Sequence, residues 1–263
     1  MARCITLTTD FGTRDPYVAE VKGVLLSDGP KGLQLVDLSH DLPPFDVHAA
    51  ALFVRAALPR FPTGTIHLAV VDPGVGSQRR ALIVSLRGMT LVGPDNCLFS
   101  YLFDGSEQVH AIDPARLGAK HISSTFHGRD LFAPVAARLA QGEPPDTFGP
   151  RIDSYQHMAF PMVEIRGDAL YGRVIHVDRY GNLITNVSDT TLRGFLGDDP
   201  RGATISLGEH AAPLLDHYAQ ARTGQLLALI GSSGLVELAA REASAASMLG
   251  AEVGRVVKVH RAP

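Results

Sequence analysis

The sequence predicts an α/β protein with a doubly wound N-terminal domain, residues 1–155, and an antiparallel β domain, residues 156–263. In the first half, strand-like apolar runs alternate with helix-like patterns, which is the rhythm of a parallel sheet with crossover helices. Glycine, proline and acidic residues then cluster between positions 142 and 150, a composition typical of a surface connection. From position 163 onward, short strand-like pieces follow one another between tight turns, which indicates antiparallel pairing.

The N-terminal elements are expected in the order that a doubly wound sheet requires. Strand-like runs lie at 5–9, 33–38 and 66–71, with helix-like patterns between them at 17–27 and 47–58. Two closely spaced strands, 81–86 and 90–92, follow around an Arg-Gly turn, and a helix is expected at 131–139. This order predicts a mostly parallel sheet with helices on both faces.

The C-terminal domain is expected to consist mainly of short strands. They lie at 172–177, 183–187, 203–207, 225–230 and 253–259. A small antiparallel barrel or sandwich fits this pattern. The small-residue run at 243–247 favours the surface of an alanine-rich helix.

The composition is that of an ordinary globular protein. Of the 263 residues, 45% are hydrophobic and 19% charged, and the formal net charge of −3 lacks the basic excess of a nucleic-acid-binding protein. No stretch approaches the roughly 20 apolar residues of a membrane span, and no long apolar segment lies near the first residues. We therefore expect a cytoplasmic protein with neither nucleic acid nor membrane as a partner. Two widely separated cysteines, Cys4 and Cys97, argue against a zinc cluster or a disulfide framework.

An aspartate at the end of the third predicted strand is the strongest candidate for chemistry. Asp72 follows the strand at 66–71, a Pro-Gly turn comes next, and Arg79 lies seven residues further along. An arginine at this spacing can fold back across the turn, and its guanidinium offers planar, permanently charged donors. The Pro-Gly pair is also compatible with a purely structural turn. The pairing of Asp72 with Arg79 favours a site for an anion or a polarised water.

Two further segments place ionisable groups beside glycine. Asp10 ends the first strand and can accept hydrogen bonds from vicinal hydroxyls, although an Asx turn would use the same residue. His127 lies between a phenylalanine and a glycine ahead of a helical pattern. Imidazole titrates near neutrality, and the glycine permits close approach of a substrate. Asp130 is interpreted as a cap of the helix that follows.

Six segments, in order, resemble the S-adenosylmethionine hydrolase family, also called the hydroxide adenosyltransferases, which are relatives of the fluorinases and chlorinases. They are 8–12 (Thr-Thr-Asp-Phe-Gly), 72–76 (Asp-Pro-Gly-Val-Gly) with Arg79, 93–96 (Gly-Pro-Asp-Asn), 126–130 (Phe-His-Gly-Arg-Asp), 180–182 (Tyr-Gly-Asn), and 231–234 (Gly-Ser-Ser-Gly) with Glu237. The resemblance runs over nearly the whole chain. It implies a fluorinase-like fold, with an N-terminal doubly wound α/β domain and a C-terminal antiparallel β-barrel domain.

The resemblance also implies an assembly and a reaction. The assembly is a homotrimer, in which the substrate lies between the N-terminal domain of one subunit and the C-terminal domain of its neighbour. In the reaction, water or hydroxide attacks the ribose C5′ of S-adenosylmethionine, with the (R)-sulfonium epimer preferred, and adenosine and methionine are formed. The implied catalytic trio is Asp72, Arg79 and His127. No metal and no cofactor are expected, because a sulfonium is already an excellent leaving group once a nucleophile is positioned.

The substrate-binding residues are carried over in the same way. Besides Asp72, they are Asp10 for the ribose hydroxyls, Asp178 and Asn182 for the methionine portion or nearby ribose, and Ser232, Glu237 and Ala240 for the adenosine or methionine end. The turn that contains Asp178 is also compatible with a plain hairpin. Two departures from the family pattern stand out: Cys97 occupies a position that is usually glycine, and 241–243 (Arg-Glu-Ala) replace the common Asn-x-Gly.

Three other functions stay open at this point. A non-catalytic adenosine or S-adenosylmethionine sensor would use the same pocket. A halogenase is disfavoured, because the halogenating relatives lack the Asp-Pro-Gly-Val-Gly and Phe-His-Gly segments that this sequence contains. A metal-dependent phosphoesterase would use oxygen and imidazole ligands from Asp10, Asp37, His40, Asp72 and Asp95, whose spacing matches no recognised metal motif.

Overall fold

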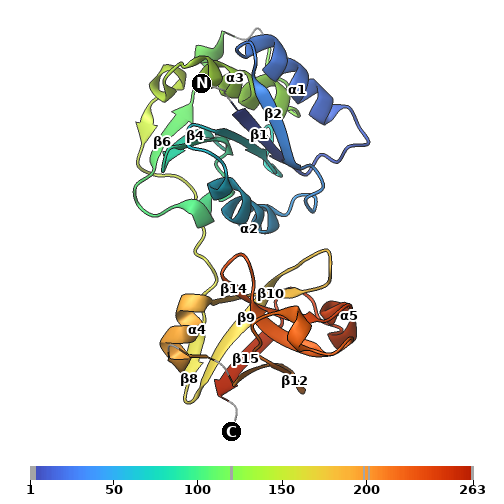
Figure 1. Cartoon of the computed structure of the whole chain (residues 1–263). Helices are drawn as coiled ribbons and strands as arrows, with labels where there is room; N and C mark the ends of the chain where they lie inside the picture. Colours follow the sequence, from blue (N-terminus) through green and yellow to red (C-terminus); the bar gives the residue numbers. More distant parts are fainter. Residues whose placement is uncertain (1–3, 119–120, 198, 201, 262–263) are drawn as a thin grey trace. The chain divides into compact units, whose positions relative to one another are not determined.

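The chain divides into two compact units, Met1–Ala159 and Phe160–Pro263, each with its own hydrophobic core (Figure 1). The computed structural model describes residues 4–118, 121–197, 199–200 and 202–261. The division falls a few residues beyond the predicted boundary at 155.

The N-terminal unit is a seven-stranded sheet with helices on both sides. Along the sheet the strands run in the order β2 (Gln34–Ser39), β1 (Cys4–Thr9), β3 (Ile66–Val70), β5 (Met89–Pro94), β4 (Ala81–Leu86), β6 (Gln108–Ile112) and β7 (Arg151–Ile152). The helices are α1 (Tyr17–Asp28), α2 (Val47–Ala57) and α3 (Ala133–Gln141). Helices α1 and α3 cover one face and α2 the other (Figure 1), which confirms the doubly wound arrangement.

The sheet is parallel in only one half, so the expectation of a mostly parallel sheet was wrong. Strands β2, β1, β3 and β5 pair in parallel, whereas β4, β6 and β7 join antiparallel. The reason is the connection between β4 and β5, which is only Arg87 and Gly88. A two-residue loop can join antiparallel strands only, and both residues have positive φ, 48° and 74°, as a tight hairpin requires.

The C-terminal unit is a nearly closed antiparallel barrel. Its strands run β12 (His210–Pro213), β11 (Ala203–Leu207), β15 (Val256–Arg261), β9 (Ala169–Val177), β10 (Leu183–Ser188), β14 (Leu235–Ala240) and β13 (Leu226–Ile230), and β8 (Glu164–Arg166) pairs with β9. Just after β12, the Leu215 N–H donates to the Ala228 carbonyl in β13 at 2.8 Å, which draws the two ends of the sheet together. A barrel, rather than a sandwich, is therefore the architecture of this unit.

Two short helices complete the C-terminal unit. Helix α4 (Asp189–Leu196) was not predicted, and α5 (Ala245–Leu249) overlaps the small-residue run at 243–247 that favoured a helix. Strand β14 was also missed. All of its residues are buried, so its sequence lacks the alternation of polar and apolar residues that marks a half-exposed strand.

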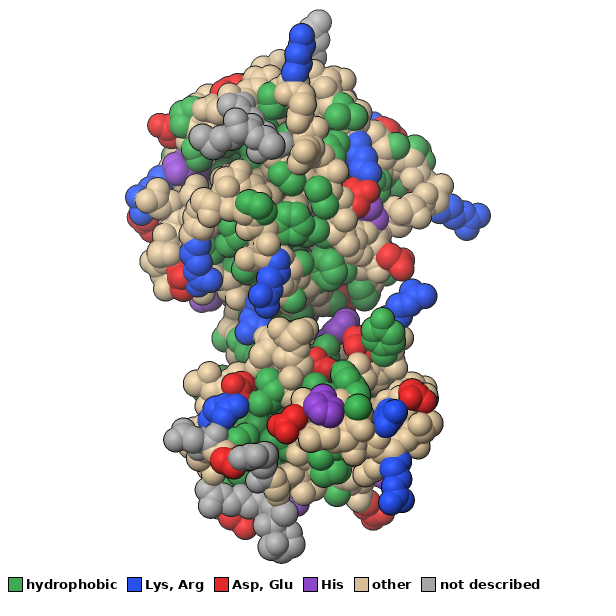
Figure 2. Space-filling model, in the orientation of Figure 1, with side chains coloured by type: hydrophobic (Ala, Val, Ile, Leu, Met, Phe, Trp, Pro, Cys, Tyr) green, Lys and Arg blue, Asp and Glu red, His purple; other side chains and the backbone are tan. Residues whose placement is uncertain are grey.

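The distribution of charged side chains on the surface agrees with the small net charge of the chain. On the face shown in Figure 2, Lys and Arg side chains are scattered and interspersed with Asp and Glu. Within the described residues, none of the helices is both long and apolar enough to cross a lipid bilayer.

A buried histidine in β3 makes the stability of the N-terminal unit sensitive to acid. His67 is fully buried, its Nδ1 lies 2.7 Å from Thr6 Oγ1, and burial lowers its pKa from 6.5 to about 4. Between these two pH values the unfolded chain binds a proton that the folded chain excludes, so stability is lost as the pH falls. Relative to pH 7, the loss from this group reaches about 3 kcal/mol near pH 4.

The check is urea unfolding of the wild type and His67→Asn at pH 7 and pH 4.5. The asparagine keeps a polar partner for Thr6 but does not titrate, so the variant should lose less stability than the wild type on acidification. Equal losses in the two proteins would contradict this assignment.

Cys97 adopts a left-handed backbone conformation, with φ 77°, which favours glycine. A side chain in this region costs about 1 kcal/mol relative to glycine. We therefore expect Cys97→Gly to be more stable than Cys97→Ala by about 1 kcal/mol, the reverse of the usual order. Chemical denaturation of the two variants measures this difference, and a more stable alanine variant would refute it.

Candidate active site

The loop that leaves β3 folds Arg79 back onto Asp72. A turn begins at Asp72, whose carbonyl accepts from the Val75 N–H at 3.2 Å. Ser77 fixes the return, because its hydroxyl donates to the Gly74 carbonyl at 2.6 Å and accepts from the Arg79 N–H at 3.2 Å. The predicted fold-back of Arg79 is thus produced by the turn itself.

Gly76 brings this loop against the segment that carries His127. It has φ 77°, and a Cβ atom placed on it would lie 2.3 Å from the Ser124 carbonyl oxygen. Because no other residue fits this approach without displacing the backbone, the glycine allows two loops from distant parts of the sequence to touch.

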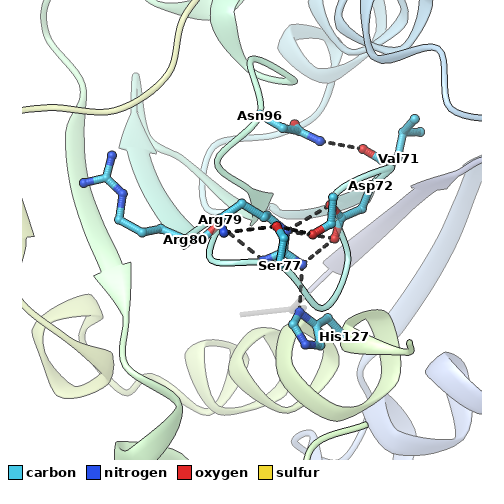
Figure 3. Close-up of polar contacts among 8 residues, drawn as sticks. Val71, Asp72, Ser77, Arg79, Arg80, Asn96 and His127 are labelled. Carbon is cyan, nitrogen blue, oxygen red and sulfur yellow. Dashed lines mark hydrogen bonds and ion pairs between the residues drawn. The ribbon is translucent and has the colours of Figure 1, made fainter. Parts of the chain in front are cut away.

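Asp72, Arg79 and His127 form one connected group (Figure 3). Arg79 Nε donates to both carboxylate oxygens of Asp72 at 2.9 and 3.0 Å, and Nη2 makes a further short bond to Oδ2. The same Nη2 lies 2.8 Å from His127 Nδ1. The Asp72 and Arg79 side chains are only 5% and 8% exposed, and the guanidinium lies 5.2 Å from the centre of the Phe132 ring. The structure thus brings together all three residues of the predicted trio.

The contact with the arginine determines which ring nitrogen of the histidine carries the proton. A guanidinium can only donate, so His127 Nδ1 must accept, and the proton of the neutral ring is then on Nε2. Burial lowers the pKa of His127, the charge on Arg79 lowers it further, and the charges on Asp72 and Asp130 oppose this. His127 is therefore a neutral imidazole near neutral pH, with an Nε2–H as its remaining polar group.

The segment after β5 holds both ends of the Asp72 loop. Asn96 Nδ2 donates to the Val71 carbonyl at 2.8 Å, just before Asp72. Asp95 is buried and binds Arg80 through Nε at 2.9 Å and Nη2 at 2.7 Å, just after Arg79. The two ends of the loop are thus held by neighbouring residues, and the second arginine of the loop has a structural partner.

A cavity of about 560 Å³ opens beside the trio in the N-terminal unit. Asp72 and His127 line it, together with Asp10 from the end of β1. Asp10 Oδ2 accepts from the Phe45 N–H at 2.9 Å. Phe45 is 72% exposed and has a positive φ of 66°, so an aromatic ring stands at the edge of the cavity on a strained backbone.

Three aromatic rings form a wall of the cavity. Phe126 contacts Phe11 and Tyr17 edge to face, with ring centres 5.9 and 5.3 Å apart, and all three rings line the cavity. Neither this wall nor Phe45 was identified from the sequence. Phe11 and Phe126 lie within the recognised segments, but Tyr17 and Phe45 lie outside them and depend on the fold for their position.

Asp178 and Asn182 lie together in the C-terminal unit, in the turn between β9 and β10. Asp178 Oδ1 accepts from the backbone N–H groups of Tyr180 and Asn182 at 2.9 and 2.8 Å, and Oδ2 accepts from Asn182 Nδ2 at 2.9 Å. The Asp178 carboxylate therefore stabilises the hairpin turn and also holds the Asn182 side chain in place.

Glu237 lies close to this turn through a tyrosine that was not predicted. Tyr218 donates to Glu237 Oε2 at 3.4 Å and accepts from Asn182 Nδ2 at 3.5 Å. Burial and the charge on Asp178 raise the pKa of Glu237. Asn182, Tyr218 and Ala240 line a second cavity, of about 500 Å³, in this unit.

Ser232 is the remaining predicted binding residue. It is exposed in the turn between β13 and β14, and its role stays a prediction.

The residues of the metal hypothesis have separate partners. Asp37 binds Lys22 and His40, Asp95 binds Arg80, and Asp72 binds Arg79. Across the ranges that the structure describes, no group of three or more His, Cys, Asp or Glu side chains is arranged to hold a metal ion.

The interpretation of Asp130 as a helix cap was wrong. It lies inside a π-helical turn, η4 (Gly128–Phe132), and its carboxylate binds Arg129 and the Ser123 N–H. The side chain is therefore used for contacts around His127 and not for the start of a helix.

Comparison with known proteins agrees with the fold. Residues 5–149 match the family model described as the SAM hydroxide adenosyltransferase N-terminal domain, and residues 172–258 match that of the C-terminal domain. A protein of Thermus thermophilus named (R)-S-adenosyl-L-methionine hydrolase is 40% identical over 98% of this chain and 99% of its own length. A crystal structure of an uncharacterized conserved protein from Thermotoga maritima superposes with a TM-score of 0.90 at 30% identity, covering 98% of this chain and 100% of that one. A fluorinase of an Actinoplanes species is more distant, at 25% identity over 98% of this chain and 97% of its own length. The chain belongs to the SAM hydroxide adenosyltransferase family.

Proposed function

We propose that this protein hydrolyses S-adenosylmethionine, as its (R)-sulfonium epimer, to adenosine and methionine. The observation that carries the proposal is the bonded group of Asp72, Arg79 and His127 beside a cavity with aromatic and acidic walls. The similarity to proteins named (R)-S-adenosyl-L-methionine hydrolase supports the substrate and its epimer.

The chemistry needs little more than a positioned nucleophile. A water oxygen attacks C5′, the C5′–S bond breaks, and its electron pair neutralises the sulfonium as methionine leaves. Acidic and aromatic walls suit a cationic substrate, since both attract positive charge. Holding the attacking oxygen in line with the sulfur supplies a large part of the acceleration.

The geometry supports distinct roles for the trio. Since His127 Nδ1 accepts from Arg79, its Nε2 already carries a proton and orients the water as a donor, not as a base. Asp72 lines the cavity and accepts the proton that the water loses as the C5′–O bond forms. Arg79, buried behind both residues, holds their orientations and provides positive charge near the developing hydroxide.

The remaining contacts are assigned in the same proposal. Asp10, held by the Phe45 N–H, binds the ribose hydroxyls through its carboxylate. Asp178, Asn182, Ser232, Glu237 and Ala240 bind the methionine and adenosine ends from a C-terminal unit, within a cytoplasmic homotrimer. No cofactor takes part.

The test is an assay for adenosine and methionine with a chelator present. Asp72→Asn should lower kcat by about 10²–10⁴-fold, the usual contribution of a general base. Arg79→Lys and His127→Ala should each lower it by about 10²–10³-fold, the usual contribution of a donor that stabilises charge in the transition state. Adenosine affinity should change little, because these residues act on the reacting atoms. His127→Gln should retain more activity than His127→Ala, since the amide can still donate a hydrogen bond.

Arg87→Lys is the matched control for Arg79→Lys. Arg87 also binds an aspartate, Asp104, through Nε and Nη2. It lies in the hairpin at the far end of β4, whereas Arg79 lies just before the start of that strand. Arg87→Lys should keep full activity. Full activity in all three trio variants, or loss of wild-type turnover with the chelator, would refute the proposal, and tight binding without product would favour a sensor.

A further inference from the structure

The segment that carries His127 is closed into a loop by the side chain of Asp130. Asp130 Oδ2 accepts from the Ser123 N–H at 2.9 Å, and the Asp130 N–H donates to the Phe126 carbonyl at 3.1 Å. Both bonds connect residues before His127 with a residue after it. The position of His127 therefore depends on how this loop is fixed to the rest of the N-terminal unit.

Arg129 makes that attachment. Its Nε donates to Asp130 Oδ1 at 2.6 Å and Nη2 to Oδ2 at 3.0 Å, while Nη1 donates to Glu20 Oε2 at 2.6 Å. Glu20 lies on α1, more than a hundred residues away in the sequence. One guanidinium thus joins the loop to a helix of the core.

The same guanidinium also supports the aromatic wall. It lies 4.9 Å from the centre of the Phe126 ring, which in turn contacts Tyr17 and Phe11. A Cβ atom on Gly128 would lie only 3.2 Å from Phe11 and 3.3 Å from Phe126. The residues on either side of His127 are therefore tightly packed, so a shift of the Phe126 ring would shift the histidine.

We propose that Arg129, held between Glu20 and Asp130, is a positioning residue that keeps His127 in contact with Arg79 and keeps Phe126 in the cavity wall. This inference rests on the proposed hydrolysis, because the rate of that reaction reports the position of His127. Arg129 and Glu20 also line the cavity, but the role assigned to Arg129 is exerted through the loop and not on the reacting atoms.

Arg129 contributes to the geometry of the loop more than to the free energy of unfolding. The side chains of Arg129 and Glu20 are 35% and 36% exposed, and ion pairs at that exposure contribute little to the free energy of unfolding. The three directed bonds need the planar fork of arginine, which lysine cannot reproduce although it keeps the charge. A lysine variant should therefore fold but hold the loop loosely.

The pH profile separates positioning from a general loss of structure. Burial and the charge of Arg79 lower the pKa of His127, while Asp72 and Asp130 oppose them. If the loop loosens, His127 leaves Arg79 and gains solvent, so its pKa rises toward the ordinary value. Since the neutral ring is the active form, the acid limb of kcat/KM should then move to higher pH.

The test compares Arg129→Lys with Arg138→Lys in the full-length protein. Arg138 is a matched control, because it makes a two-pronged bond to Glu143 and lies 4.8 Å from the centre of the Phe148 ring. Arg129→Lys should lower kcat by about 10–100-fold, the effect of a displacement of up to about 1 Å, with KM changed less than about three-fold and the acid limb shifted upward. Arg138→Lys should match the wild type in kcat, in KM and in the position of the acid limb.

A second pair of variants tests the link to α1. Glu20→Gln keeps an oxygen acceptor for Arg129 and should retain most of the wild-type kcat, whereas Glu20→Ala should lower it. Unchanged kcat in both Arg129→Lys and Glu20→Ala would overturn the inference, as would a raised KM with normal kcat, which would indicate direct substrate contact. Absence of turnover in the wild type would instead refute the proposed function, and this inference with it.

Discussion

The buried guanidinium of Arg79 is the interaction on which the site depends. It binds the Asp72 carboxylate with two nitrogens and donates to His127 Nδ1, so one side chain fixes residues that are 48 and 7 positions away. Because a guanidinium never accepts and never loses its charge at working pH, the bond also determines which nitrogen of His127 carries the proton. The different roles proposed for Asp72 and His127 follow from this one donor.

The rest of the N-terminal unit keeps this contact in place. Parallel strands deliver Asp10 and Asp72 to one edge of the sheet, and Asp95 and Asn96 hold the two ends of the Asp72 loop. Gly76 lets that loop touch the Ser124 backbone. The site is therefore made of loops whose ends are fixed by directed hydrogen bonds, which is how a loop can hold reacting groups with the precision of a strand.

Much of the fold and of the site could be predicted from the sequence, because local residue patterns indicate them. The apolar run before Asp72 and the spacing to Arg79 predicted the ion pair, and the alternation of elements predicted the helices on both faces. Strand β14 was not predicted, because it is buried throughout and its sequence shows no alternation of polar and apolar residues. Phe45 and Tyr218 were not predicted, because only the fold brings them next to Asp10 and Glu237. Asp130 was misread, since a capping aspartate and one that closes a loop look alike in sequence. The homotrimer, the cytoplasmic location and the absence of a cofactor stay predictions.

The most direct test of the central claim is the fate of the attacking oxygen. Incubation of the protein with epimer-mixed S-adenosylmethionine in ¹⁸O-water, followed by mass spectrometry, follows that atom into the product. The account predicts one ¹⁸O in the 5′-hydroxyl of adenosine, unlabelled methionine, and depletion of the (R)-sulfonium epimer. Unlabelled adenosine, or label in methionine alone, would contradict attack of water at C5′.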